Sequence, residues 1–215
     1  TFTGRSVAAR TSQGRCSFAL YEGTSDYGEL VICDGVNEPF LFQMTGTDSD
    51  VTNRTFFAKE ITVSGTTGPA IGVIHDKHLV VAGASTAKNT IFYSGTNDID
   101  DFTSSGSGSI VIEDAVVGLA SFRSDLIIFC KNSIHKLVNI NDSSNVAVVP
   151  ITTNVGCVSG GSIQEIGGDL LFLSPDGVRT VAGTARIGDV ELGSVSRQIQ
   201  SLISDIAADK DYIIT

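Results

Sequence analysis

The stretch Leu79-Val80-Val81-Ala82 is a short apolar run, and runs of this kind recur along the chain. The others are Leu30-Val31-Ile32-Cys33, Leu126-Ile127-Ile128-Phe129 and Leu170-Leu171-Phe172-Leu173. Their leading leucines lie 49, 47 and 44 residues apart. Repeats of roughly 40–50 residues that are built from short strands are typical of β-propeller blades. The sequence therefore predicts an all-β protein, a β-propeller with four-stranded antiparallel blades, of which about four lie in this segment of a larger propeller.

The blade boundaries follow from glycine-rich turns between the apolar runs. We expect the four leading leucines at equivalent positions on the second strand of each blade, largely buried. Because those second strands lack a clean alternation of apolar and polar residues, we also expect them to be buried on both faces. The predicted segments are a leading segment at 1–14, blades within 15–193 (about 15–63, 70–113, 116–151 and 162–193), a helix at 194–207 and the start of a further strand at 208–215.

The predicted helix interrupts the repeat near the C-terminal end. Val195, Ile199, Leu202, Ile203 and Ile206 share one face at helical spacing. Ser194 is placed to cap its N-terminus. We interpret this amphipathic helix as an insertion between blades, and Ala185–Leu192 before it as the fourth strand of the last blade.

Composition limits the classes of function. The 215 residues are 41% apolar and 18% charged, with a formal net charge of −10. An acidic chain gains no affinity from counterion release at phosphates, which argues against specific nucleic-acid binding. It still allows DNA to pass nearby, because like charges repel. No apolar run approaches the roughly 18–20 residues of a membrane helix, so no membrane span is expected.

The four cysteines are Cys16, Cys33, Cys130 and Cys157. They are sparse and show no Cys-x-x-Cys or Cys/His ligand spacing, which makes a zinc site improbable. In a chain that can form a large core, such cysteines are expected to be reduced thiols.

The three histidines are the first candidates for chemistry. His75 and His78 flank Asp76-Lys77 and have the spacing of two metal ligands on a helix, but they fall in a hairpin turn where the side chains should diverge. We interpret the segment as a solvated polar turn. His135 alternates with apolar neighbours and is predicted to face outward from a strand.

Acidic clusters at Asp48-Ser49-Asp50 and Asp98-Ile99-Asp100-Asp101 invite comparison with calcium loops. Neither supplies the alternating carboxylates, glycine and closing glutamate of the best-known calcium loop in order. We interpret both as loop acidity, with weak cation binding at Asp98 or Asp100 as the alternative. The second cluster opens a long loop, Asn97–Gly108, which is predicted to have a flexible end.

Nucleophile motifs are missing from the sequence. It contains no G-x-S-x-G, and the serines in Gly106-Ser107-Gly108-Ser109 and Gly160-Gly161-Ser162 lie in flexible or strand-initiating segments. We therefore predict no catalytic, cofactor-binding or metal-binding residue, no cofactor and no enzymatic activity.

Several segments resemble the β-propeller tail proteins of short-tailed bacteriophages, known as tail nozzle, tail tubular or tail-hub stabilisation proteins. The similar segments cover roughly residues 15–209 and include Val155–Val158 with Ser162–Arg179, Thr90–Gly95 with the loop to Phe102, Val116–Phe122 with Leu126–Phe129, and the predicted helix. The resemblance implies a virion protein, assembled in the host cytoplasm, that forms a homo-oligomeric ring (sixfold in the family) around the DNA exit channel. Its partners would be the portal or adaptor and the fibres or needle of the tail.

A binding propeller of more general kind is the alternative. The turn Ser174-Pro175-Asp176-Gly177 is equally typical of TolB-like propellers, and such modules bind peptide or carbohydrate at the mouth of the central channel. Convergent aromatic residues on the loops of every blade would favour that reading. The loops here are rich in Gly, Ser and Asp, which favours a role in assembly.

Overall fold

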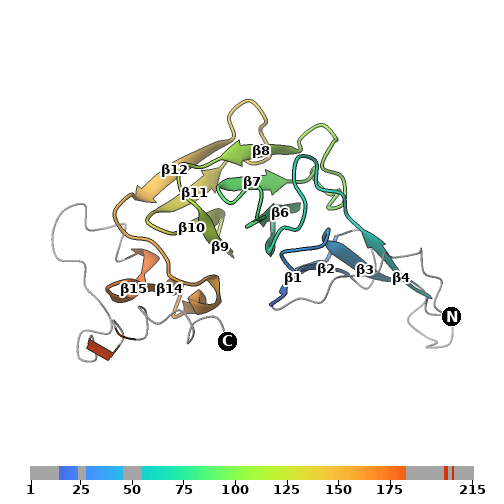
Figure 1. Cartoon of the computed structure of the whole chain (residues 1–215). Coiled ribbons are helices and arrows are strands. Elements are labelled where there is room, and N and C mark those ends of the chain that lie inside the picture. The colour runs from blue at the N-terminus through green and yellow to red at the C-terminus, as the bar shows by residue number, and fades with distance from the viewer. Residues whose placement is uncertain (1–14, 24–27, 46–54, 183–200, 203–204, 206–215) are drawn as a thin grey trace. The chain divides into compact units, whose positions relative to one another are not determined.

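The computed structural model describes residues 15–23, 28–45, 55–182, 201–202 and 205 (Figure 1). Within these residues the fold is all-β, with fifteen strands and very little helix. The strands form four separate antiparallel sheets, and in each sheet consecutive strands are paired as a meander. The chain divides into two compact units, residues 1–112 with 139–146, and residues 113–138 with 147–215.

Unit 1 contains two four-stranded sheets. In both, each strand pairs with its neighbour in sequence. The first sheet consists of β1 (Ser17–Tyr21), β2 (Glu29–Cys33), β3 (Phe40–Thr45) and β4 (Thr55–Glu60). The second consists of β5 (Ile71–His75), β6 (His78–Ala82), β7 (Thr90–Tyr93) and β8 (Gly108–Val111).

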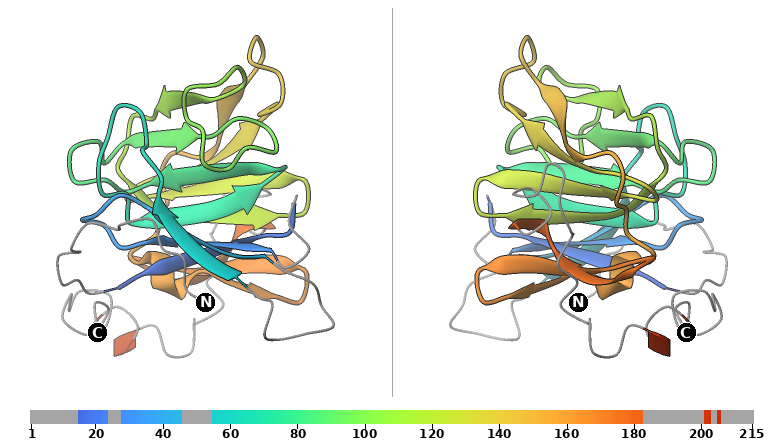
Figure 2. Two further views of the ribbon diagram at one scale, coloured as in Figure 1. Left: turned by 90° about the vertical axis from the view of Figure 1, so that its right-hand side faces the viewer. Right: turned by 90° about the vertical axis from the view of Figure 1, so that its left-hand side faces the viewer.

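Unit 2 contains one four-stranded sheet and one with three described strands (Figure 2). The first consists of β9 (Val116–Phe122), β10 (Asp125–Cys130), β11 (Ile134–Val138) and β12 (Ala147–Thr152). After the 3₁₀ turn η2 (Gly160–Ser162), the second consists of β13 (Gln164–Ile166), β14 (Asp169–Ser174) and β15 (Gly177–Thr180). The predicted fourth strand, Ala185–Leu192, lies outside the described residues.

The four leading leucines occupy equivalent places, as predicted: each is the second residue of the second strand of its sheet. Leu79 and Leu126 are 0% exposed and Leu170 is 3% exposed. The prediction of burial is wrong for Leu30, which is partly exposed. In β2 the buried residues are Glu29, Val31 and Cys33, because the core lies against their face of the sheet.

Burial of the second strand on both faces was also expected in every sheet. β6 is buried along its whole length, and β10 along all but its first residue. β2 and β14 instead alternate between buried and partly exposed residues, so the expectation is wrong for these two strands. An apolar run therefore does not by itself decide whether both faces of a strand are covered.

Each unit has its own apolar core. In unit 1, Val31 and Cys33 of β2 pack with Leu79 and Val81 of β6. In unit 2, Phe129 of β10 and Phe172 of β14 contribute aromatic rings whose centroids lie 5.3 Å apart. These side chains join the two sheets within each unit and account for much of its stability through burial of apolar area.

The β7–β8 loop is anchored to the core of unit 1. Ile99 is 2% exposed and Phe102 is 7% exposed, and both belong to that core. Asp101 accepts hydrogen bonds from the Thr103 and Ser104 backbone N–H groups, at 2.7 and 3.1 Å. Two apolar side chains thus tie the acidic start of the loop to the sheets, whereas the flexible end was predicted for the Ser- and Gly-rich part that follows.

The described part of the predicted helix 194–207 is small. Ser201, Leu202 and Asp205 are helical, and the remainder, Ser194 and its other apolar positions included, lies outside the described residues, as do 1–14 and 208–215. Nowhere in the described ranges is there a helix with the length and apolar character needed to cross a membrane.

Candidate functional site

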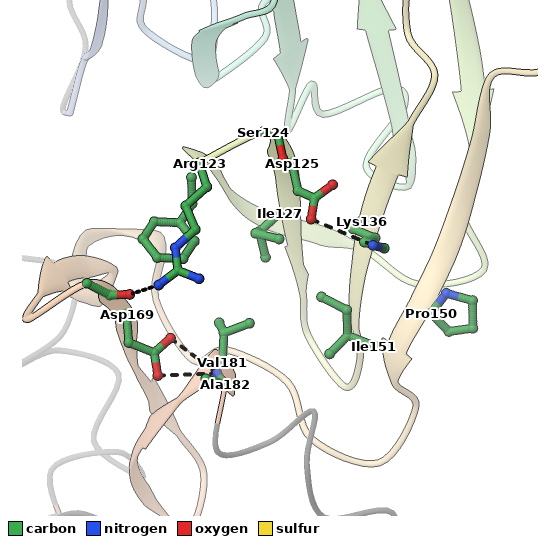
Figure 3. A pocket seen from close by; sticks show the side chains of 12 residues that line it. Arg123, Ser124, Asp125, Ile127, Lys136, Pro150, Ile151, Asp169, Val181 and Ala182 are labelled. Carbon is green, nitrogen blue, oxygen red and sulfur yellow. Dashed lines mark hydrogen bonds and ion pairs between the residues drawn. The ribbon is translucent and has the colours of Figure 1, made fainter.

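A cleft of about 620 Å³ opens within unit 2 and is a candidate binding site among the described residues (Figure 3). It is lined by the β9–β10 turn, β11, β12, the β13–β14 turn and the two residues that follow β15. Sites for small ligands commonly have volumes of about 300–1,000 Å³. The cleft was not predicted, since its walls come from five separate stretches of sequence.

The β9–β10 turn supplies the most unusual backbone of the cleft. Phe122 and Asp125 pair across the two strands, so Arg123 and Ser124 are the two central residues of a tight hairpin. Arg123 has a φ of 55°, in the left-handed region that glycine adopts more easily than other residues. The β13–β14 turn, by contrast, has glycine at both central positions, Gly167 and Gly168.

The Arg123 side chain is held from two directions. Its guanidinium carbon lies 4.9 Å from the centre of the Phe122 ring, a cation–π arrangement. Its Nη2 donates a hydrogen bond of 2.7 Å to the Gly168 carbonyl oxygen (Figure 3). These two contacts fix the guanidinium at the wall of the cleft although the residue is exposed.

The opposite wall carries an ion pair between Asp125 and Lys136, with Nζ and Oδ2 3.6 Å apart. Their side chains are 41% and 37% exposed. Exposed pairs of this kind contribute about 0.2–1 kcal/mol, so this one can open at little cost when a ligand competes for either partner.

The floor between these walls is aliphatic. Ile127 is 4% exposed and Val181 is 8% exposed. Ile151 joins them through a β-bulge: in the β11–β12 register Ile134 pairs with Thr152 and His135 with Pro150, which leaves Ile151 without a partner. Bulges redirect side chains in this way, and here the lining of the cleft includes the bulged residue.

Asp169 also lines the cleft, but its oxygens are engaged in holding the fold. Its Oδ1 accepts the Leu170 N–H at 2.8 Å, and the Ala182 N–H lies 3.2 and 3.3 Å from the two oxygens. These bonds fasten the chain after β15 to the start of β14. Asp169 therefore lines the cleft but offers little free acceptor capacity.

The cleft brings together groups that can hold a ligand. It combines a fixed guanidinium, an exposed ion pair and an aliphatic floor. Ser124 also lines the cleft and adds a hydroxyl group.

His75 and His78 depart from their prediction. They form the closing pair of the β5–β6 hairpin, so their side chains lie on the same face instead of diverging. His75 is 6% exposed and His78 is 0% exposed, whereas the central residues Asp76 and Lys77 are exposed. The solvated polar turn thus contains Asp76 and Lys77 alone, and the prediction is wrong for both histidines.

His78, itself buried, is the centre of a hydrogen-bond network in unit 1 that reaches the exposed residues Asn141 and Asp76. Its Nδ1 lies 2.6 Å from the Ser94 carbonyl oxygen and its Nε2 lies 3.0 Å from Asn141 Oδ1. Asn141 in turn donates through Nδ2 to the Asp76 carboxylate. The network fixes the loop 139–146 onto this hairpin, which the sequence did not indicate because Asn141 is 63 residues from His78.

His135 is half-buried, less exposed than an outward-facing strand residue would be. Its Nε2 lies 2.9 Å from Ser133 Oγ, and that hydroxyl donates to Asp114 Oδ2 at 3.2 Å. Burial lowers the pKa of His135. In a catalytic triad the carboxylate accepts a hydrogen bond from the imidazole. Here the Asp114 carboxylate accepts one from the Ser133 hydroxyl instead, so the order of hydrogen bonds differs.

Two carboxylates of the described acidic cluster, those of Asp100 and Asp101, make contacts that hold the fold. Asp100 forms an ion pair with Lys59, and hydrogen bonds from Thr103 lower the pKa of Asp101. Asp98 is exposed, and Asp48 and Asp50 lie outside the described residues. Over the described ranges, no three His, Cys, Asp or Glu side chains are grouped closely enough to hold a metal ion.

The remaining candidates are also structural. Ser162 Oγ donates a 2.6 Å hydrogen bond to the Ser159 carbonyl oxygen within η2, and Ser107 Oγ donates to Ser104. All four cysteines are free thiols; Cys16 is exposed and the other three are buried. Burial raises the pKa of the Cys130 thiol to about 12, which leaves it protonated and unreactive near neutral pH.

Comparison with protein-family models finds no match for the chain, and comparison with curated proteins finds none either.

Proposed function

We propose that the chain is a non-enzymatic structural protein of a bacteriophage tail and forms part of a homo-oligomeric ring around the DNA exit channel. The observation that carries the proposal is the repeat: meander sheets follow one another along the chain, each with a leucine at the second position of its second strand. Repeats of this kind suit a β-propeller, here a segment of a larger one.

The free face of the first sheet supports a propeller. Phe18 is 64% exposed and Leu20 is 59% exposed on the face of β1 opposite to the core. They pair across the strands with Ile32 and Leu30, which extends the apolar surface onto β2. In a propeller the two faces of a blade are covered by neighbouring blades, so this apolar face would meet a further sheet.

Charge supports the place of the protein in a DNA channel. A net charge of −10 repels the phosphate backbone, so DNA can pass without binding tightly. The resemblance to tail nozzle proteins adds the partners: a portal or adaptor on one side and fibres or a needle on the other. In this proposal the protein resides in the virion after assembly in the host cytoplasm.

The test is to determine copy number in two settings. Native mass spectrometry of the purified protein and quantitative mass spectrometry of intact particles should both give a ring stoichiometry, six copies if the family pattern holds. A protein that stays monomeric at concentrations used for assembly and is absent from purified particles would contradict the proposal.

A propeller that binds peptide or carbohydrate, similar to TolB-like proteins, is the second candidate. One observation favours it, the cleft of unit 2 with its fixed guanidinium. If this second candidate is right, substitutions that destroy the cleft should impair ligand binding. If the first proposal is right, the same substitutions should leave ring formation unchanged.

A further inference from the structure

The Arg123 guanidinium has donor capacity that faces the cleft. A guanidinium carries five N–H donors. Among the described residues, its hydrogen-bond acceptor is the Gly168 carbonyl oxygen, which engages Nη2. In Figure 3 the other terminal nitrogen points toward the open space of the cleft. An anion in the cleft would therefore meet a donor group that is already oriented.

Among the described residues that line the cleft, Arg123 is the cation that has no carboxylate partner. Lys136 is paired with Asp125, and Asp169 accepts backbone N–H groups from Leu170 and Ala182. A planar guanidinium fixed in this way matches a carboxylate better than a flexible ammonium does, because it can donate two parallel hydrogen bonds.

The backbone at Arg123 is one that glycine adopts more easily than arginine. A non-glycine residue at a φ of 55° is less stable than glycine would be there. Arginine is not one of the residues enriched in the left-handed region, which are asparagine, aspartate and histidine. Asp76 and Lys77 in the β5–β6 turn also have positive φ, so the left-handed backbone follows from the geometry of a two-residue hairpin turn.

The floor defines the rest of the ligand. Ile127, Ile151 and Val181 present aliphatic surface and few hydrogen-bonding groups. A sugar would leave hydroxyl groups without partners there, which is unfavourable. An aliphatic side chain would gain from burial. The covered Phe122 face is also closed to stacking by a sugar ring, because the guanidinium lies over it.

We propose that the cleft binds a short peptide segment in which a carboxylate lies next to an aliphatic side chain. The carboxylate is held by Arg123, and the aliphatic side chain lies against Ile127, Ile151 and Val181. The inference concerns the cleft alone and does not depend on ring formation. The carboxylate can belong to an Asp or Glu side chain or to a peptide C-terminus, and the experiment separates these sources.

Three dipeptides serve as probes, each titrated into ¹⁵N-labelled protein and followed by NMR. Acetyl-Leu-Glu-amide carries a side-chain carboxylate, acetyl-Gln-Leu with a free C-terminus carries a terminal one, and acetyl-Leu-Gln-amide is neutral. We expect saturable shifts at the amides of Arg123, Ile127 and Ile151 with at least one charged probe. The affinity of the neutral probe should be lower by a factor of about ten or more, because it cannot form the charge-assisted hydrogen bonds.

Arg123→Gly separates binding from stability. Glycine relieves the left-handed backbone, so the urea midpoint should stay the same or rise, while affinity for the charged probe falls about tenfold or more. Arg123→Lys keeps the charge, loses the planar fork and should bind with intermediate affinity. Lys131→Ala, which removes an exposed cation outside the cleft, is the matched control and should bind as the native protein does.

Equal affinity for charged and neutral probes would overturn the proposal, as would unchanged affinity in Arg123→Gly or the lack of saturable shifts with both charged probes. Ring stoichiometry in Arg123→Gly is expected to be native. The two proposals can therefore fail separately.

Discussion

Arg179 shows how a single residue holds the last described turn of unit 2. Its side chain is 5% exposed, and its Nε donates a 2.8 Å hydrogen bond to Asp176 Oδ1. Ser174 Oγ donates to the same oxygen at 2.8 Å. Asp176 therefore neutralises a buried cation and closes the Ser-Pro-Asp-Gly turn. The turn itself could be predicted from sequence because proline and glycine stand where a tight turn requires them.

Asp176→Asn should lower the free energy of unfolding at neutral pH. It should also make that free energy less dependent on pH in the acidic range. The hydrogen bond from Arg179 lowers the pKa of Asp176 in the folded protein. A lowered folded pKa contributes stability that is present above the unfolded value, about 3.9, and is lost as the pH falls through the folded value. The variant should cost about 1–3 kcal/mol at pH 7, since it leaves a buried guanidinium without its charged partner.

Urea unfolding at pH 7 and at a series of acidic pH values measures both effects. The two proteins should converge in stability below the folded pKa of Asp176, where the native carboxyl is also neutral. Asp125→Asn, which breaks the exposed pair with Lys136, is the control and should change stability by about 1 kcal/mol at most. Equal stability of Asp176→Asn and the native protein at pH 7 would show that the ion pair contributes nothing.

Residues that meet across long sequence separations were beyond prediction. Arg123 and Gly168 are 45 residues apart, and His78 and Asn141 are 63 apart. Locally, the Arg123 turn reads as an ordinary polar hairpin, and the pair His75 and His78 reads as a solvated turn. The local sequence of either segment does not show which distant carbonyl or amide completes its hydrogen bonds. The sequence therefore predicted neither the cleft nor the hydrogen-bond network around His78.

At the scale of elements, the second strand of each sheet could be located from sequence, but its burial could not. Leu30-Val31-Ile32-Cys33 is as apolar as Leu126-Ile127-Ile128-Phe129, yet β2 alternates in burial and β10 does not. An apolar residue fits either face of a strand, so composition does not report what covers that face. The loop 97–107 did carry a signal, since Ile99 and Phe102 are apolar residues within an acidic stretch.

Leu126→Ala and Leu30→Ala should therefore differ although they occupy equivalent positions. Leu126 is 0% exposed, so its truncation leaves a cavity and should cost about 2–5 kcal/mol. Leu30 is partly exposed and should cost clearly less. Chemical denaturation of both variants measures the difference. Equal losses would mean that the outer face of β2 is covered in solution, for example by another subunit, and dilution of the sample would then reduce the loss at Leu30.

At the scale of the molecule, the four sheets belong to two compact units, each with its own core. The repeat in the sequence predicted meander sheets because each sheet is built from consecutive strands. It could not predict the grouping into units, which depends on side chains between sheets, such as Phe129 against Phe172. The net negative charge is likewise a property of the whole molecule, because it is the sum over all ionised groups and not the charge of one cluster.

The charge makes a prediction about DNA that separates a channel protein from a nucleic-acid reader. With a net charge of −10, the protein should not retard duplex DNA even at about 50 mM salt, where phosphate contacts are strongest. Electrophoretic mobility shift with a labelled duplex measures this, and a basic DNA-binding protein in the same gel is the positive control. Repulsion should keep the DNA free at every protein concentration tested. Retardation that weakens as salt is added would reveal a cationic surface on the folded protein, and the channel role would then have to involve direct contact with the phosphate backbone.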